Sequence, residues 1–402
     1  MAINKLFARR ALKAQPSAIR EICKLAAKTD VKSLAGGWPS GDTFPVEEVK
    51  QIVRNVLDEK PELALQYGTS EGLVELRLAL AEWLQNRDGF ECSSDQIMIT
   101  SGSTQGIELC AKVFLEPGDA AFVGLPSYFG GIGACQAFGA HLVGVPLDLD
   151  GMVPNELEKR AAFAMEQGHR PKLLYIIPDY QNPTGAVVPL DRRRKILETA
   201  SRYDMVVVED SPYRDLSFEG EPFPPLMALD RDSRVVFLRS FSKNFCPGFR
   251  LSLLAGPEDV VRNMVIARQF EDACPDVFGQ HVLLDFLKKG FLDKQIEKNR
   301  AYYIKKRDRI LDLLDENFPK QVTWNRPKGG FFVFVHLPEG MSGMDLLDKA
   351  VKNNVTFVAG SAFFVDGGGT NTVRLSYSEA DDESLEQAIV VLGRLLKEMI
   401  KG

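Results

Sequence analysis

Short apolar runs alternate with amphipathic stretches between about residues 95 and 255. The apolar runs are Ile97–Thr100, Ala120–Gly124, Leu173–Ile177, Met205–Glu209, Val235–Ser240 and Leu251–Ala255. Because consecutive residues in these runs are apolar, both faces of each strand must be buried, which is typical of a parallel sheet covered by helices on both sides. Ile107, Cys110 and Phe114 form one face of a helix that ends before Pro117. The pattern predicts a large, doubly wound α/β domain with a mostly parallel sheet.

The last third of the chain has a different pattern. Ile296, Tyr303, Ile310 and Leu314 mark one face of a long helix. We expect later strands at Phe331–His336, Val355–Val358 and Thr372–Ser376, and later helices at Gly343–Lys352 and Glu383–Lys397. This mixture predicts a smaller α+β domain built from both ends of the chain. The expected division is residues 45–280 for the large domain and residues 1–44 with 281–402 for the small one, with His336 in the core.

Composition narrows the class of protein. The chain has 45% hydrophobic and 26% charged residues, which excludes disorder as a description of the whole chain. Its net charge of −6 argues against nucleic acid or an anionic membrane as a partner. No apolar stretch approaches the roughly 20 residues that span a bilayer. The six cysteines are scattered without a CxxC pair, so we expect reduced thiols, a cytoplasmic protein and no metal site.

A lysine between serines directly follows one predicted strand, in the segment SFSKNFCPGFR. Lys243 is a candidate amine nucleophile that could form a Schiff base with a carbonyl compound. Ser240, Ser242 and Arg250 could together hold a phosphate group. Taken alone, a lysine in such a position is more often an ordinary surface residue, so this interpretation depends on other groups at the same edge of the sheet.

Those other groups follow neighbouring strands. Ser103 and Thr104 open a helix after the run that ends at Thr100, and a helix N-terminus binds anions. Asn182 follows a second strand, and Asp210 ends a third, three residues before Tyr213. Because open α/β sheets bind ligands at the carboxyl ends of their strands, these side chains are expected to converge.

The motifs NPTG, Asp-x-x-Tyr and SxSK with a downstream PGxR resemble those of the fold-type I pyridoxal-phosphate aminotransferases of class I/II. The resemblance extends from about Ser17 to Arg374. The segments AGGWP, QYGTSEG and SAIRE most resemble the 2-aminoadipate and kynurenine aminotransferase branch. The resemblance implies transfer of an amino group between an L-amino acid and a 2-oxo acid, with 2-oxoglutarate as the expected acceptor, by a ping-pong mechanism.

The resemblance also assigns roles in binding pyridoxal 5'-phosphate. Lys243 would form the Schiff base and shuttle a proton, and Asp210 would keep the pyridine nitrogen protonated. Asn182 and Tyr213 would bind the phenolic oxygen, and Tyr128 would stack on the ring. The phosphate would be held by Ser103, Thr104, Ser240, Ser242 and Arg250. Tyr67 would reach the cofactor of a neighbouring subunit, which implies a homodimer.

Substrate contacts follow from the same resemblance. Arg374 would bind the α-carboxylate, and Gly37 and Asn182 would line the substrate pocket. Arg20 would either bind a second, distal carboxylate or merely pair with a nearby acid, and the large ring of Trp38 complicates the choice between dicarboxylic and aromatic substrates. The basic residues before Ser17 superficially resemble a mitochondrial presequence, but we expect the segment from Ser17 onward to be part of the folded enzyme.

Two other functions fit parts of this pattern. A carbon–sulfur β-lyase could use the same cofactor-binding residues, and only product analysis separates it from an aminotransferase. A transcription regulator would carry this domain behind an N-terminal DNA-binding domain, and the cofactor domain is expected to begin too early in this chain for that.

Overall fold

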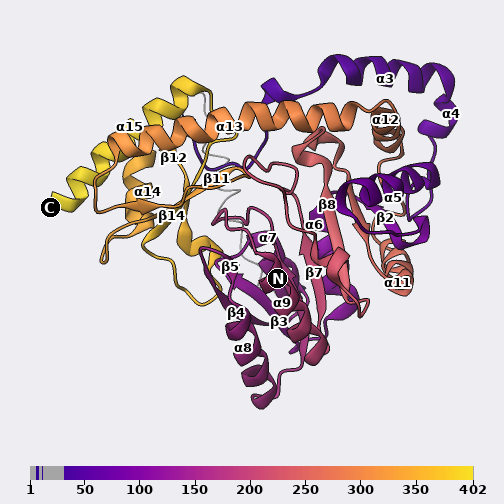
Figure 1. Ribbon diagram of the computed structural model, residues 1–402, viewed down its shortest axis with the longest axis horizontal. Helices are drawn as coiled ribbons and strands as arrows, with labels where there is room; N and C mark the ends of the chain where they lie inside the picture. The colour runs from indigo at the N-terminus through magenta and orange to yellow at the C-terminus, as the bar shows by residue number, and fades with distance from the viewer. Residues whose placement is uncertain (1–5, 9–10, 12–30, 402) are drawn as a thin grey trace.

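The computed structural model describes residues 6–8, 11 and 31–401, and an eight-stranded sheet forms its centre (Figure 1). In spatial order the strands are β2 (Ile97–Thr100), β9 (Ser252–Ala255), β8 (Val235–Ser240), β7 (Val206–Asp210), β6 (Pro171–Ile176), β3 (Ala120–Leu125), β4 (His141–Asp148) and β5 (Gly151–Met152). The five strands from β8 to β4 run parallel, while β9 is antiparallel to both its neighbours and β5 is antiparallel to β4. The expected mostly parallel sheet is therefore confirmed.

Alternate residues of the strands face two different layers of helices. Val208 packs in one core with α6 (Ser103–Phe114), α7 (Phe129–Ala137) and α11 (Glu258–Arg268). Val207 packs in another with α8 (Pro154–Glu166) and α9 (Leu190–Arg202). Burial on both faces explains why these strands are continuously apolar.

A third core lies where β2, β8 and β9 meet a further group of helices. The helices of this region are α3 (Val46–Glu59), α4 (Pro61–Ala64), α5 (Val74–Asp88), α10 (Leu226–Leu229) and α12 (Val277–Lys288). The layers together form the doubly wound α/β architecture that the hydrophobic pattern predicts.

The small domain has its own antiparallel sheet. Its order is β10 (Thr323–Trp324), β11 (Phe332–His336), β14 (Thr372–Ser376) and β13 (Val358–Ala359), and a separate parallel pair joins β1 (Lys32–Ser33) to β12 (Val355–Thr356). Helices α14 (Gly343–Val351) and α15 (Asp382–Lys401) pack on these strands around a separate core. The pairing of β1 with β12 brings residues near the start of the chain into this domain.

Helix α13 (Phe291–Asn317) connects the two domains (Figure 1). The residues of α13 pass from one core to the next along the helix. Ile296 is buried beside α12, Tyr303 in the core of the large sheet, and Ile310 in the core of the small domain. Because one helix belongs to both cores, the division at residue 280 stays a prediction.

Two local expectations are corrected by the structure. His336 is exposed rather than buried, because it is the last residue of β11 and follows the buried residues Phe332–Val335, although its ring meets the Phe334 ring edge to face. The expected strand Val355–Val358 is split, since Val355–Thr356 pairs with β1 while Val358–Ala359 pairs with β14. Within the described residues, no helix combines the length and apolar character needed to cross a membrane.

Candidate active site

The polar groups singled out from the sequence meet at the carboxyl edge of the large sheet. Asp210 is the last residue of β7, and Lys243 ends a 3₁₀ turn directly after β8. Asn182 lies in the turn that follows β6. Because β6, β7 and β8 are parallel neighbours in register, their ends bring these three residues together.

Lys243 is half-buried and held at both its backbone and its amine. Its Nζ donates a hydrogen bond of 2.9 Å to the carbonyl oxygen of Gly37, and its own carbonyl accepts one of 3.0 Å from Asn299. Burial, with the positive charges of Arg250 and Arg374, lowers the pKa of the amine to about 8 against the attraction of Asp210. A neutral amine, the nucleophilic form, is therefore accessible near physiological pH.

Asp210 is almost completely buried. Its Oδ2 accepts a hydrogen bond of 2.8 Å from the hydroxyl of Tyr175, while its Oδ1 is buried and has no hydrogen-bond partner among the described residues. Burial raises the pKa of the carboxyl to about 6, although Tyr175, Ser103 and Lys243 act in the opposite direction. The carboxylate thus has one satisfied oxygen and one oxygen available to a ligand.

Arg374 comes from β14 of the small domain and reaches the same site. Its Nη1 donates a hydrogen bond of 2.9 Å to Oδ1 of Asn182, and its Nη2 donates to the carbonyl of Ala35. The guanidinium carbon lies 4.2 Å from the ring centroid of Phe332, close enough for a favourable cation–π contact. Residues from opposite ends of the chain therefore form one wall of the site.

The start of α6 and the segment around Lys243 form a cradle suited to a phosphate group, and its residues are Ser103, Thr104, Ser240, Ser242 and Arg250. Ser103 and Thr104 begin α6, and Arg250 donates a hydrogen bond of 3.3 Å from Nη1 to the Ser242 hydroxyl. The Ser240 hydroxyl accepts from the backbone nitrogen of Ser242 at 3.2 Å. A free helix N-terminus beside a guanidinium and serine hydroxyls is a general anion site.

Gly102 makes the close approach in this cradle possible. Its φ is +80°, and a Cβ added to it would lie 2.0 Å from Nη2 of Arg250. The guanidinium therefore packs directly on the backbone of residue 102, where any other residue would displace it.

Two tyrosines complete the cluster. Tyr128 precedes α7, and the charges of Asp210, Arg374 and Arg250 all influence its hydroxyl, whose pKa is raised mainly by burial. Tyr213 is buried, with its ring centroid 5.6 Å from that of Phe332.

Two predicted residues do not join this cluster. Tyr67 is 84% exposed, and Arg20 lies outside the described residues. Gly37 reaches the cluster from the loop after β1, and the remaining predicted residues lie in the segments at this edge of the large sheet or on β14.

A buried network of charged residues next to Lys243 was not predicted from the sequence. Asn244, the next residue, donates a hydrogen bond of 2.5 Å to Oδ2 of Asp215. Asp215 belongs to a buried network of ion pairs. The network reaches the loop that carries Asn182, and its other members are Asp88, Asp179, Arg193, Arg214 and Arg239. Buried charges are stable only when paired, so this network ties the two loops together. Buried acids and arginines spread over the sequence have no spacing that would reveal it.

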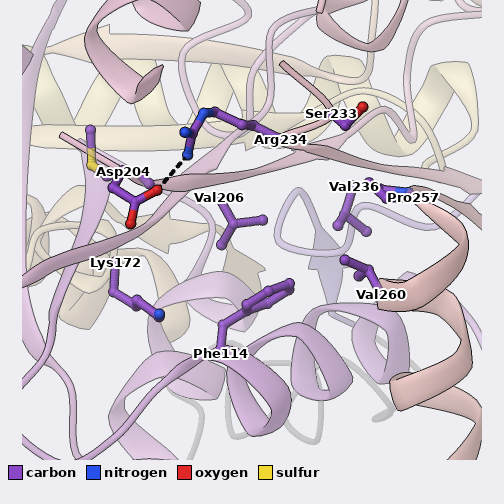
Figure 2. A pocket seen from close by; sticks show the side chains of 10 residues that line it. Phe114, Lys172, Asp204, Val206, Ser233, Arg234, Val236, Pro257 and Val260 are labelled. Atoms are coloured by element: carbon purple, nitrogen blue, oxygen red, sulfur yellow. Dashed lines mark hydrogen bonds and ion pairs between the residues drawn. The ribbon is translucent and has the colours of Figure 1, made fainter. Parts of the chain in front are cut away.

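Figure 2 shows a different hollow, at the amino ends of β6, β7 and β8. Its volume is about 170 Å³, and Val206 and Val236 form part of its lining. Arg234 and Asp204 at its rim form an ion pair of 2.9 Å. The hollow lies at the opposite edge of the sheet from Lys243, and it contains none of the residues predicted for the site.

Comparisons with known proteins identify the family of the chain. Residues 29–392 match the family described as aminotransferase class I and II. The aromatic-amino-acid aminotransferase 1 of Thermococcus litoralis is 40% identical over 398 residues, which cover 99% of this chain and 95% of that protein.

Two solved structures share the whole fold. The kynurenine aminotransferase of Pyrococcus horikoshii, in complex with PMP, has a TM-score of 0.95 and 39% identity, covering 100% of this chain and 99% of that one. The alpha-aminoadipate aminotransferase of Thermus thermophilus, complexed with N-(5'-phosphopyridoxyl)-L-leucine, has a TM-score of 0.91 and 36% identity, covering 100% of both chains.

These matches confirm both the family and the branch inferred from the motifs. The chain belongs to the class I and II aminotransferases, and it is a pyridoxal-phosphate-dependent enzyme that transfers an amino group between an amino acid and a 2-oxo acid.

Proposed function

We propose that the cluster around Lys243 is the catalytic site, with Lys243 and Asp210 as its catalytic residues. The observation that carries this proposal is a lysine of lowered pKa at the same strand edge as a buried aspartate with one oxygen available. When bound, pyridoxal phosphate supplies a carbonyl carbon that takes up the amino group and a ring that withdraws electrons from the substrate.

The donor set fits this cofactor. A buried carboxylate oxygen without a partner is unfavourable, and Oδ1 of Asp210 has none within the part of the chain that the structure describes. A protonated pyridine nitrogen is the donor that it lacks. Asn182 and Tyr213 would hold the phenolic oxygen, and Tyr128 would cover one face of the ring.

The cofactor's phosphate would be held by the cradle at the start of α6. Backbone N–H groups and the helix dipole at Ser103 and Thr104 favour a dianion, and Arg250 adds a full positive charge. Ser240 and Ser242 supply hydroxyl groups from the loop that also carries Lys243. The same short segment would therefore hold the phosphate and supply the amine.

Substrate would be oriented from the small domain. Arg374 would bind the α-carboxylate through its planar, two-pronged guanidinium, which Phe332 and Asn182 hold in place. Gly37 would line the pocket with its backbone, because a side chain there would lie 2.7 Å from the Phe332 ring.

Lys243 would move the proton that the reaction requires. Its amine, with a pKa of about 8, is neutral in roughly a tenth of the molecules at pH 7, far more than for an ordinary lysine. Nζ would accept the proton released at the α-carbon of the substrate and hold it for the return step. The carbonyl of Gly37 accepts a hydrogen bond from Nζ and so orients it toward the substrate side.

We propose a ping-pong cycle with 2-oxoglutarate as amino acceptor. Relatives named for aromatic amino acids, kynurenine and alpha-aminoadipate support donors with either an aromatic or a second acidic group. Trp38 is half-exposed beside the Gly37 wall and could contact either kind of side chain. Arg20 would favour the acidic donors, 2-aminoadipate and glutamate.

We further propose a homodimer in which Tyr67 reaches the cofactor of the partner subunit. Tyr67 is almost fully exposed in the single chain, and the apolar residues Leu63 and Leu65 on the same segment are about two-thirds exposed. Exposed apolar patches of this kind typically mark protein interfaces. A second copy of this chain would cover them and would complete two sites at once.

We propose the cytoplasm as the location of the enzyme. The described cysteines, which exclude Cys23, are all free, in keeping with a reducing compartment.

Trapping the lysine tests the catalytic assignment. Cofactor-free protein is mixed with pyridoxal phosphate and reduced with borohydride, and mass spectrometry of its peptides should locate the adduct on Lys243. Lys243→Ala should lose transamination, whereas Lys195→Ala, a change at an exposed lysine on α9, should keep it. An adduct on another lysine, or normal turnover by Lys243→Ala, would overturn the assignment.

A further inference from the structure

Tyr175 carries the one polar side chain among the buried residues of β6, whose other buried residues are Pro171, Leu173, Leu174 and Ile176. It lies in β6, is completely inaccessible to solvent, and donates a 2.8 Å hydrogen bond to Oδ2 of Asp210. Burying a phenol hydroxyl is unfavourable unless it has a partner, and Asp210 supplies that partner. Burial raises the pKa of Tyr175 well above its ordinary value, so the hydroxyl stays a proton donor.

The surrounding structure makes room for this ring. A Cβ added to Gly131 of α7 would lie 2.3 Å from Cε1 of Tyr175. No L-residue with a side chain could occupy position 131 without moving the ring and its hydroxyl. The contact between Tyr175 and Asp210 thus depends on a glycine of a neighbouring helix as well as on the strand.

We infer that Tyr175 is a positioning residue, which holds Oδ2 of Asp210 so that Oδ1 stays directed at the ring nitrogen of bound pyridoxal phosphate. The inference rests on the proposed function and adds to it a residue outside the family motifs quoted from the sequence. A carboxylate with one anchored oxygen loses less freedom when its other oxygen binds a ligand, which favours ligand binding.

Other groups also face the Asp210 carboxyl. Ser103 and Cys110 approach it from α6, Lys243 from the loop after β8, and Tyr128 and Tyr213 from their own segments. Lys243 and Ser103 act, like Tyr175, to lower the pKa of Asp210, and both remain when Tyr175 is changed. Loss of the Tyr175 hydroxyl should therefore raise that pKa further without neutralising the site.

Tyr175→Phe removes only the hydroxyl and keeps the ring. The matched control is Tyr377→Phe, since Tyr377 is equally buried and its hydroxyl donates to the carbonyl of Gly330 at 2.8 Å. In cofactor-free protein, carbon-13 NMR of the aspartate carboxyls should show the Asp210 titration shifted upward by about one pH unit in Tyr175→Phe, because a hydrogen bond to the charged form is lost. Tyr377→Phe should leave that titration unchanged.

A second measurement compares two ligands. Tyr175→Phe should bind pyridoxal phosphate about tenfold more weakly, because the Asp210 carboxylate is no longer anchored before the ligand binds. It should bind the analogue with carbon in place of the ring nitrogen within about threefold of the unaltered protein. With amino donors, kcat should fall while KM changes little.

The outcomes separate the inference from the proposed function. Equal weakening for both ligands would show that Tyr175 merely supports the fold, and unchanged binding of both would show that Asp210 does not need it. Either result overturns the inference while leaving the catalytic assignment intact. Failure of the unaltered protein to bind pyridoxal phosphate at Lys243 would instead overturn the proposed function.

Discussion

Replacing Asp210 with asparagine should change how the stability of the cofactor-free enzyme depends on pH. The carboxyl has a pKa of about 6 in the folded protein, against an ordinary value of 3.8 in the unfolded chain. The folded state therefore binds this proton more tightly. Between these two pKa values the folded state carries more protons than the unfolded state, so stability falls as pH rises.

The magnitude follows from the size of the shift. Each pKa unit corresponds to about 1.4 kcal/mol, so a shift of roughly two units destabilises the folded protein by about 3 kcal/mol above pH 7. Roughly 2 kcal/mol of this loss should accumulate between about pH 4.5 and pH 7.5. The asparagine side chain of the variant does not titrate, and its oxygen can still accept the hydrogen bond from Tyr175.

The assay is urea unfolding of both cofactor-free proteins at about pH 4.5 and pH 7.5, at one protein concentration. The quantity compared is the change in unfolding free energy between the two pH values, because any constant effect of the substitution cancels in it. The unaltered protein should lose about 2 kcal/mol more than Asp210→Asn over this interval. Equal losses in the two proteins would show that burial does not raise the pKa of Asp210, and the electrostatic reasoning would be refuted.

Three further predictions concern the phosphate cradle, the substrate and the assembly. Gly102→Ala should weaken pyridoxal phosphate binding at least tenfold by displacing Arg250. Gly248→Ala should not weaken it, because a Cβ at residue 248 would meet no atom within 4 Å, and fluorescence titration of the cofactor-free proteins measures both affinities. Arg20→Ala should reduce kcat/KM at least tenfold for 2-aminoadipate and glutamate and much less for aromatic donors, since losing a charged contact costs roughly 2–5 kcal/mol. An equal loss of kcat/KM across a panel of donors would show that Arg20 has no part in specificity. Sedimentation should show a dimer that Leu63→Asp dissociates, and an active monomer of the unaltered enzyme would contradict the assembly.

The sequence predicts the large domain well because its signals are local. Lys243, Asp210 and Asn182 each follow an apolar run, and parallel strands place such residues at a common edge regardless of loop details. The strand β4 escaped prediction although residues 142–147 are all apolar, because this run contains Gly144 and Pro146, which are disfavoured inside strands.

Features that depend on distant contacts could not be predicted in the same way. Tyr175 sits in an apolar run, where an aromatic residue indicates core packing, and only the fold brings its hydroxyl to Asp210. The exposure of His336 depends on where β11 ends, which the apolar pattern does not specify. Tyr67 is exposed on its own chain, so its predicted role depends on a second subunit.

The order of strands has a consequence for how the enzyme is made. β2 lies at the sheet edge with β9 as its one neighbour in the described sheet, yet about 150 residues separate the two strands along the chain. At ribosomal rates of roughly 5–20 residues per second, β2 waits on the order of 10 seconds for its partner. An unpaired apolar strand is prone to aggregation during such a delay. The contact between Ala35 and Arg374 can form only later still, so cofactor capture is expected to follow synthesis of nearly the whole chain, and nascent chains should depend on chaperones rather than on pyridoxal phosphate.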